Sequence, residues 1–173
     1  MKKIFPVSLL IIFLISCGYK LTQKRLSKPV KIYVYYFKNN TNETRVEDFL
    51  TQYLKDEIIL HEDTILVSNL KKADLFLKGN IEEFKYTGVS YLSSERVLEY
   101  RIWAKVRVNL IDKFGNVLKS KDFLENKEFR TGITEYNLKN VDIGITENLR
   151  KIVVKEVTKK IAEDIYDWLF YNF

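Results

Sequence analysis

Few residues of this chain have the side chains that catalysis or metal binding usually requires. The sequence contains one cysteine, Cys17, and one histidine, His61. One histidine provides almost no basis for a Ser-His-Asp triad or a histidine-rich metal site. The sequence also has no glycine-rich phosphate loop and no Cys-x-x-Cys pair. His61 follows a predicted helix in a polar segment, which favours a surface position. We therefore predict no catalytic residue, no metal site and no cofactor, and expect a protein that binds or assembles.

The cysteine ends a hydrophobic N-terminal segment, which indicates another kind of chemistry. Two lysines precede an apolar run over residues 4–15, and a serine and Cys17 follow it. The run is shorter than the about 20 apolar residues that span a bilayer, so it is typical of a signal peptide. Leu14-Ile15-Ser16-Cys17 resembles the lipobox of bacterial lipoproteins, in which the chain is cut before the cysteine and the cysteine is then acylated. We predict a lipoprotein signal peptide over residues 1–16 and lipidation of Cys17.

Lipidation would consume the only thiol and fix the protein to a membrane. No disulfide can then form, and attachment through two or more acyl chains is durable. Gly18 stands where Asp would favour inner-membrane retention, so we expect the outer membrane. Two of the 29 basic residues leave with the signal peptide, so 27 remain against 23 acidic residues, a net charge of +4. This small excess of positive charge does not indicate a nucleic-acid partner. It is compatible with binding to an anionic lipid or polysaccharide.

The longest predicted strand carries the candidate binding residues. Residues 97–112 alternate between an apolar side and a polar side that includes Trp103. The basic residues are Arg101, Lys105 and Arg107, followed by Lys119 and Lys121 on the returning strand of a predicted hairpin. We interpret these five residues as a cationic stripe with an aromatic platform, which suits phosphates and sugars. An ordinary solvated sheet face is the alternative interpretation.

The elements that position this stripe follow from periodicity and turn residues. Strands are expected over residues 31–37, 65–67, 73–86, 97–112 and 117–130, and helices over residues 46–60 and 141–170. Asn42 or Thr44 is expected to cap the first helix. Gly115 and Asn116 are expected to supply positive φ in the hairpin turn. Residues 88–94 and 131–140 are interpreted as connectors.

Each predicted helix has one apolar stripe. The first consists of Val46, Phe49, Leu50, Tyr53, Leu54 and Ile58, and the second of Ile145, Leu149, Ile152, Val153, Val157, Ile161, Ile165, Trp168 and Leu169. We predict the α+β class: an antiparallel-dominated sheet of about four long strands with two helices packed on one face, in β-α-β-β-β-α order. Residues 17–29 would form the lipidated N-terminus and tether, and residues 30–173 a single domain.

The C-terminus is rich in aromatic residues. They are Tyr166, Trp168, Phe170, Tyr171 and Phe173. Trp168 belongs to the helical stripe and is expected in the core. The last three are a candidate docking tip.

A series of short motifs runs through the predicted mature chain in a definite order. They are Cys17-Gly18-Tyr19-Lys20-Leu21, the strand Ile32-Tyr33-Val34-Tyr35-Tyr36-Phe37 with Asn39-Asn40-Thr41 after it, Phe49-Leu50-Thr51, Ala73-Asp74-Leu75-Phe76-Leu77-Lys78-Gly79-Asn80-Ile81, Tyr100-Arg101, and Asp112-Lys113-Phe114-Gly115-Asn116-Val117-Leu118. Together they resemble the LPS-assembly lipoproteins of the LptE family. The resemblance covers essentially all of the mature chain.

The resemblance implies a function. Members of the family sit as a plug inside an outer-membrane β-barrel of the LptD type, support assembly of that barrel, and bind lipopolysaccharide through basic residues on the sheet side. Only Cys17 carries over directly, and the five-residue stripe carries over as a hypothesis. The expected partners are such a barrel, lipopolysaccharide, and the membrane through the N-terminal lipid. The alternatives are a periplasm-facing lipoprotein that binds a cell-envelope ligand without a barrel, and a hydrolase with an unrecognised site.

Overall fold

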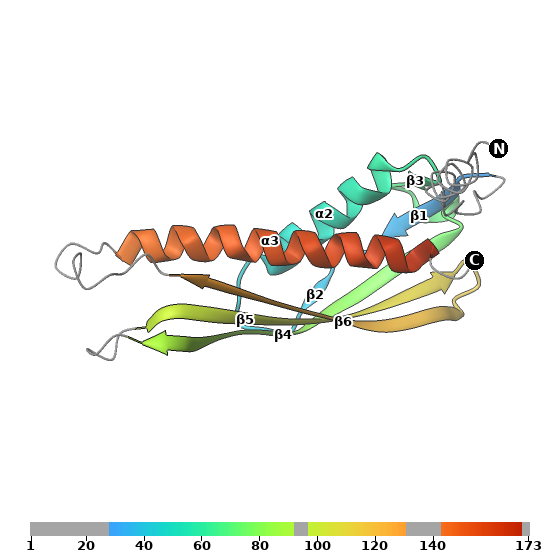
Figure 1. Ribbon diagram of the computed structural model, residues 1–173. Helices are drawn as coiled ribbons and strands as arrows, with labels where there is room; N and C mark the ends of the chain where they lie inside the picture. Colours follow the sequence, from blue (N-terminus) through green and yellow to red (C-terminus); the bar gives the residue numbers. More distant parts are fainter. Residues whose placement is uncertain (1–27, 92–96, 131–142, 171–173) are drawn as a thin grey trace, which may run out of the picture.

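Two helices lie along one face of a twisted sheet in the computed structural model (Figure 1). The structure describes residues 28–91, 97–130 and 143–170. Their strands are β1 (Val30–Val34), β2 (Lys38–Asn39), β3 (Thr64–Leu66), β4 (Leu75–Tyr91), β5 (Val97–Asp112) and β6 (Val117–Arg130), and their helices are α2 (Val46–Leu60), the 3₁₀ helix η1 (Leu70–Lys72) and α3 (Ile143–Phe170). The predicted α+β class is confirmed.

The sheet combines long antiparallel strands with short parallel ones. Its order is β3-β1-β4-β5-β6, and β2 pairs with β4 beside this path. The long strands β4, β5 and β6 pair antiparallel, whereas β1 pairs parallel with both β3 and β4. Three long strands are present in the described residues where about four were expected, because the first predicted strand (residues 31–37) ends at Val34 and only the two-residue β2 follows it.

Phe37 is the reason for this division. Ile32 and Val34 are buried, but Tyr36 is 60% exposed and Phe37 is buried, so the alternation changes phase after Val34. The Phe37 ring occupies the space over Gly79, where a Cβ atom would lie 2.2 Å from the ring carbon Cε1. The Phe37 backbone N–H donates to Thr51 Oγ1 of α2 at 3.1 Å. The turn between β1 and β2 therefore places an aromatic ring in the core.

The start of α2 differs from the expected capping. The N-cap residue is Arg45 in the left-handed region (φ 67°), without a side-chain cap, so the prediction of Asn42 or Thr44 was wrong. Asn39 organises the preceding loop instead, because its Nδ2 donates to the Glu43 carbonyl and to Glu47 Oε2, both at 2.7 Å. The buried face of α2 includes Thr51 as well as the predicted Leu50, Leu54 and Ile58.

Helix α3 covers the long strands with a wider apolar face than predicted. Its buried side chains are Val153, Val154, Val157, Thr158, Ile161, Ala162, Ile165, Tyr166 and Leu169. The centre of this face lies between the 153-157-161 and 154-158-162 rows, which leaves Ile152 54% exposed and corrects its assignment to the core. Trp168 and Phe170 are partly buried against the core. Tyr171 and Phe173 lie outside the described residues.

One further boundary differs from the prediction. Strand β4 continues to Tyr91, so residues 88–91 are strand and not connector.

The β5–β6 turn also differs from the prediction. Only Gly115 has positive φ (90°) in this turn, and Asn116 does not. Asp112 holds this turn, because its Oδ1 accepts hydrogen bonds from the N–H groups of Phe114 and Asn116 at 2.8 and 2.9 Å. The predicted loop 131–140 and the first two residues of the predicted last helix lie outside the described residues.

Candidate functional site

The face of the sheet opposite the helices, which we call the outer face, carries the first candidate site. The alternation of β5 buries Ile102, Ala104, Val106, Val108 and Leu110 on the helix side. Arg101, Trp103, Lys105 and Arg107 therefore lie on the outer face, as the sequence predicted. Trp103 is 44% exposed, so part of its large aromatic ring system is available on a face that neither helix covers.

Two carboxylates neutralise Lys105 and Arg107. Lys105 Nζ lies 2.9 Å from Glu82 Oε2 and 3.1 Å from Asp122 Oδ2. Arg107 lies 3.0 Å from Glu82 through Nη1 and 2.7 Å from Asp122 through Nε. Glu82 reaches both cations because the β4–β5 register shifts between Ile81 and Glu83. The four side chains form a closed ring of ion pairs across β4, β5 and β6.

The ion pairs shift the pKa values of Asp122, Lys105 and Arg107. Hydrogen bonds from Arg107 and then Lys105 lower the pKa of Asp122 from 3.8 to about 2. The pKa of Lys105 is raised, chiefly by its hydrogen bond to Glu82, and the pKa of Arg107 is raised by its hydrogen bond to Asp122. These shifts favour the charged forms of Asp122, Lys105 and Arg107 at neutral pH. A phosphate must therefore exchange with a carboxylate to bind here.

Arg101, which lies beyond Trp103 on the same face of β5, is also paired. Its cross-strand partner is Glu128, to which Arg101 Nε donates at 2.8 Å. The outer face is thus a mixed-charge surface with a projecting Trp103 and an exposed Leu124. It is not the uniformly cationic stripe that the basic residues alone suggested.

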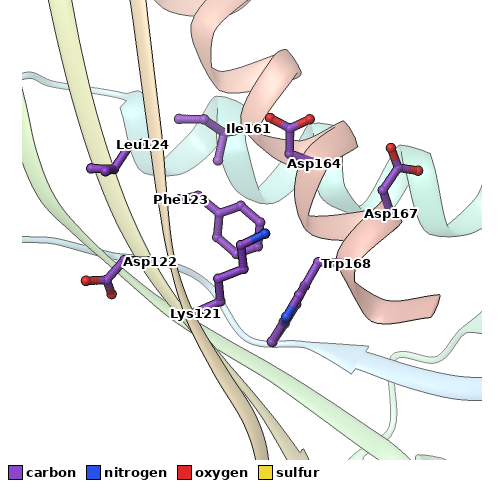
Figure 2. A pocket seen from close by; sticks show the side chains of 8 residues that line it. All are labelled: Lys121, Asp122, Phe123, Leu124, Ile161, Asp164, Asp167 and Trp168. Carbon is purple, nitrogen blue, oxygen red and sulfur yellow. The ribbon is translucent and has the colours of Figure 1, made fainter. Parts of the chain in front are cut away.

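Lys119 and Lys121 lie on the other side of the sheet. Lys119 is opposite Leu110 and Lys121 is opposite Val108, and both partners are buried beneath the helices. Figure 2 shows Lys121 and Phe123 directed toward α3, whereas Asp122 and Leu124 point away from it. The structure therefore divides the five predicted residues between two surfaces, three on the outer face and two under α3.

Lys121 borders a groove between β6 and α3 (Figure 2). Its volume is about 470 Å³, and it is lined by Lys121, Asp122, Phe123, Leu124, Ile161, Asp164, Asp167 and Trp168. Lys121 Nζ lies 4.9 Å from the centre of the Phe123 ring, which packs edge-on against Trp168. Lys119 Nζ donates to the Leu169 carbonyl near the end of α3 at 3.5 Å, a favourable place for a cation. Sequence reasoning missed this groove because its two walls are far apart in the chain.

His61 is a half-exposed residue at the C-terminal cap of α2. Its ring stacks on Tyr166 with 4.1 Å between ring centres. Its Nε2 lies 3.6 Å from Glu57 Oε2. Within residues 28–91, 97–130 and 143–170, no three His, Cys, Asp or Glu side chains gather where they could hold a metal ion.

A second polar cluster joins the helix layer to the sheet. Arg150 of α3 pairs with Glu43, which precedes α2, and its guanidinium lies 4.8 Å from the centre of the Tyr86 ring of β4. Burial raises the pKa of Tyr86 to about 12. The pKa of Arg150 is also raised, first by its hydrogen bond to Glu43. This cluster fixes the position of α3 over the sheet and supplies no reactive group.

The carboxylates of the outer face were the functional residues that sequence reasoning missed. Glu82 stands 23 residues before Lys105, and Asp122 follows the hairpin. The adjacent pair Glu82-Glu83 interrupts the alternation of β4 and is the signal that could have indicated the bulge.

Fold and site together define a class: a small α+β domain in which the sheet face opposite the helices is charge-paired and suited to contact with another molecule. The family model described as LptE, lipopolysaccharide-assembly, matches residues 30–169. The chain belongs to this family of non-enzymatic assembly lipoproteins of the cell envelope. Its role is that of an LPS-assembly lipoprotein.

Solved structures show the same fold at low sequence identity. The rare lipoprotein B of Shewanella oneidensis is 11% identical with a TM-score of 0.56, covering 80% of this chain and 92% of its own. Lipoprotein B of Nitrosomonas europaea is 17% identical with a TM-score of 0.55, covering 86% and 88%. A Xanthomonas campestris protein is 9% identical with a TM-score of 0.60, covering 87% of each chain. No curated protein matches the chain by sequence.

In the part of the chain that the structure describes, no helix is long and apolar enough to cross a membrane.

Proposed function

We propose that this protein is an outer-membrane lipoprotein, anchored through Cys17, that plugs an LptD-type β-barrel and supports its assembly. The family match over residues 30–169 is the observation that carries the proposal. In this proposal the pair delivers lipopolysaccharide to the outer leaflet, and the plug binds lipopolysaccharide on the way. The lipid keeps the plug at the membrane where the barrel is built.

The outer face supports a role as a contact surface. Charges that enter an interface without partners are costly, because their lost hydration is not replaced. On this face Arg101, Lys105 and Arg107 already have carboxylate partners before any other molecule arrives. Trp103 and Leu124 project beside them as apolar contact area. Such a face can be covered by a barrel wall without leaving these three cations unpaired.

The same ion pairs suggest how lipopolysaccharide is held. Arg107 engages Asp122 through two hydrogen bonds, Nε to Oδ1 at 2.7 Å and Nη2 to Oδ2 at 3.0 Å. A phosphate offers two oxygens in the same arrangement. A lipid A phosphate can therefore take the place of Asp122 on Arg107 and Lys105, while Trp103 lies under an adjoining sugar.

Lipopolysaccharide pull-down with matched variants tests this exchange. Lys105→Gln with Arg107→Gln removes the two cations, so retention should fall. Asp122→Asn removes the competing carboxylate, so retention should rise above that of the parent. Lys159→Gln, which changes an exposed lysine of α3, is the control and should leave retention unchanged. Unchanged retention in the double variant and in Asp122→Asn would contradict binding at this ring.

Extraction of outer membranes tests the plug. The lipidated protein should co-purify in a fixed ratio with a β-barrel in mild detergent, and Trp103→Glu should weaken that association. Mass spectrometry of the N-terminal peptide checks acylation at Cys17, which Cys17→Ser should abolish. A free monomer in repeated extractions would favour the barrel-independent envelope lipoprotein instead.

A further inference from the structure

One end of the domain, which we call the proximal end, gathers segments that are distant in sequence. Strand β1 begins there, with Val30 opposite Thr64 just after α2. The start of β4 pairs with β1 and with Asp112, so the β5–β6 turn lies at the same end. Lys119 contacts the Leu169 carbonyl, which brings the end of α3 there as well. In Figure 1 these segments meet at the right of the molecule.

Large apolar side chains are exposed on three separate connections of the proximal end. They are Ile59 and Leu60 at the end of α2, Leu70 in η1, and Phe114, Val117 and Leu118 at the hairpin. Phe114 is 79% exposed and Leu60 is 72% exposed. Clustered apolar exposure of this kind marks an interaction site. Because the residues come from three tips and not from one flat face, they fit a deformable surface better than a rigid one.

Lysines accompany these apolar tips. Lys71 and Lys72 follow Leu70, Lys113 precedes Phe114, and Lys28 and Lys31 lie where the chain enters β1. Acidic residues at this end include Glu57, Glu62, Asp63, Asp74, Asp112 and Asp167. Asp74 accepts a hydrogen bond from the Lys31 N–H, and Asp112 is engaged by the hairpin backbone. Apolar tips flanked by lysines are typical of segments that lie in the headgroup region of an anionic membrane.

We propose that the proximal end docks on the surface of the bilayer, with Phe114, Leu70 and Leu60 in the headgroup region and the lysines on lipid phosphates. The proposal rests on lipidation of Cys17 as proposed above. Ten residues lie between Cys17 and Lys28, so the connecting chain spans at most about 40 Å. The chain enters the domain at the proximal end, so the anchor tethers the domain to the membrane through this end.

Depth-dependent fluorescence quenching tests the docking. The full lipidated protein is reconstituted into phosphatidylethanolamine–phosphatidylglycerol vesicles that contain brominated lipid. Phe114→Trp should add blue-shifted emission that the brominated lipid quenches, and the quenching should weaken when phosphatidylcholine replaces the anionic lipid. Ile152→Trp is the matched control, because this exposed apolar site lies about 25 Å along α3 from Leu169. Its added emission should be unquenched.

The outcomes separate this inference from the proposed function. If the protein floats with the vesicles and the emission added by Phe114→Trp is unquenched, docking is wrong while anchoring stands. Equal quenching of Phe114→Trp and Ile152→Trp also contradicts docking by the proximal end. If the protein does not float and Cys17 carries no lipid, the proposed anchoring fails, and the docking fails with it.

Discussion

Alternate residues of the same two strands make the two faces of the β5–β6 hairpin. Different interactions stabilise the two faces. On the helix side Ile102, Val108 and Leu110 are fully buried beneath α2 and α3. On the outer face Arg101, Lys105 and Arg107 are held by Glu82, Asp122 and Glu128. Burial of a large aliphatic side chain contributes about 1.5–3 kcal/mol, whereas an exposed ion pair contributes about 0–1 kcal/mol. The inner face therefore specifies the fold, and the outer face is free to serve contact with a partner.

Truncation of a side chain on the inner face should give the largest change in the free energy of unfolding. Ile102→Ala leaves a cavity between the sheet and the helices, so we expect the free energy of unfolding to fall by about 2–5 kcal/mol. Leu124→Ala, on the outer face of β6, should change it by less than about 0.5 kcal/mol. Urea denaturation measures both values. Similar losses in the two variants would mean that the outer face also carries the fold.

Addition of one carbon to the inner face should have an intermediate effect. In Gly79→Ala the new Cβ atom meets the Phe37 ring at 2.2 Å, so we expect a loss of about 1–3 kcal/mol. Phe37→Leu should relieve part of this loss in the double variant, whose stability then exceeds that of Gly79→Ala. Gly88→Ala is the control, since its new Cβ atom meets first the hydroxyl end of the exposed Tyr91, which can move away, and then Val97 Cγ1 at 3.1 Å. Absence of rescue by Phe37→Leu would show that the ring is not the obstacle.

The smallest expected effect belongs to the outer face and depends on pH. The pKa of Asp122 is about 2 in the folded protein against its usual 3.8. Its charge therefore stabilises the fold above about pH 4, and this stabilisation is lost as the pH falls toward 2. Asp122→Asn should lack this pH-dependent stabilisation. We expect it to stay below about 1 kcal/mol, because the ion pairs of Asp122 are partly exposed. Denaturation from pH 5 to pH 2 measures it against the parent and Ser120→Ala, and identical pH profiles would contradict it.

The contrast between the two faces also explains what could be predicted from sequence. The bounds of β5 and β6 were predicted to the residue, because strict alternation and the Asp112–Asn116 turn are local signals. The outer positions of Arg101, Lys105 and Arg107 followed from the same period of two. The side on which Lys119 and Lys121 lie did not, because it depends on a register shift between Leu110 and Ile111. One residue of slip moves every later side chain to the opposite face.

The ion-pair partners were beyond prediction for a related reason. Glu82 meets Lys105 and Arg107 only because β4 has a register shift at that position. The phase change at Phe37 likewise depends on the absence of a side chain at Gly79, more than forty residues later in the chain. Both features belong to the packing of distant segments, which periodicity does not encode.

The position of β6 at the end of the strand order has a consequence for the chain before it meets a partner. A long edge strand is a template for pairing with another chain, and self-association through such edges leads to aggregates. The charged residues of β6 point to both sides of the sheet: Lys119, Lys121, Glu125 and Lys127 to one, and Asp122 and Glu128 to the other. A strand of a second molecule added to this edge would have to place its own side chains beside this alternating charge on both faces. The edge strand β6 therefore resists edge-to-edge polymerisation before the protein has bound a partner.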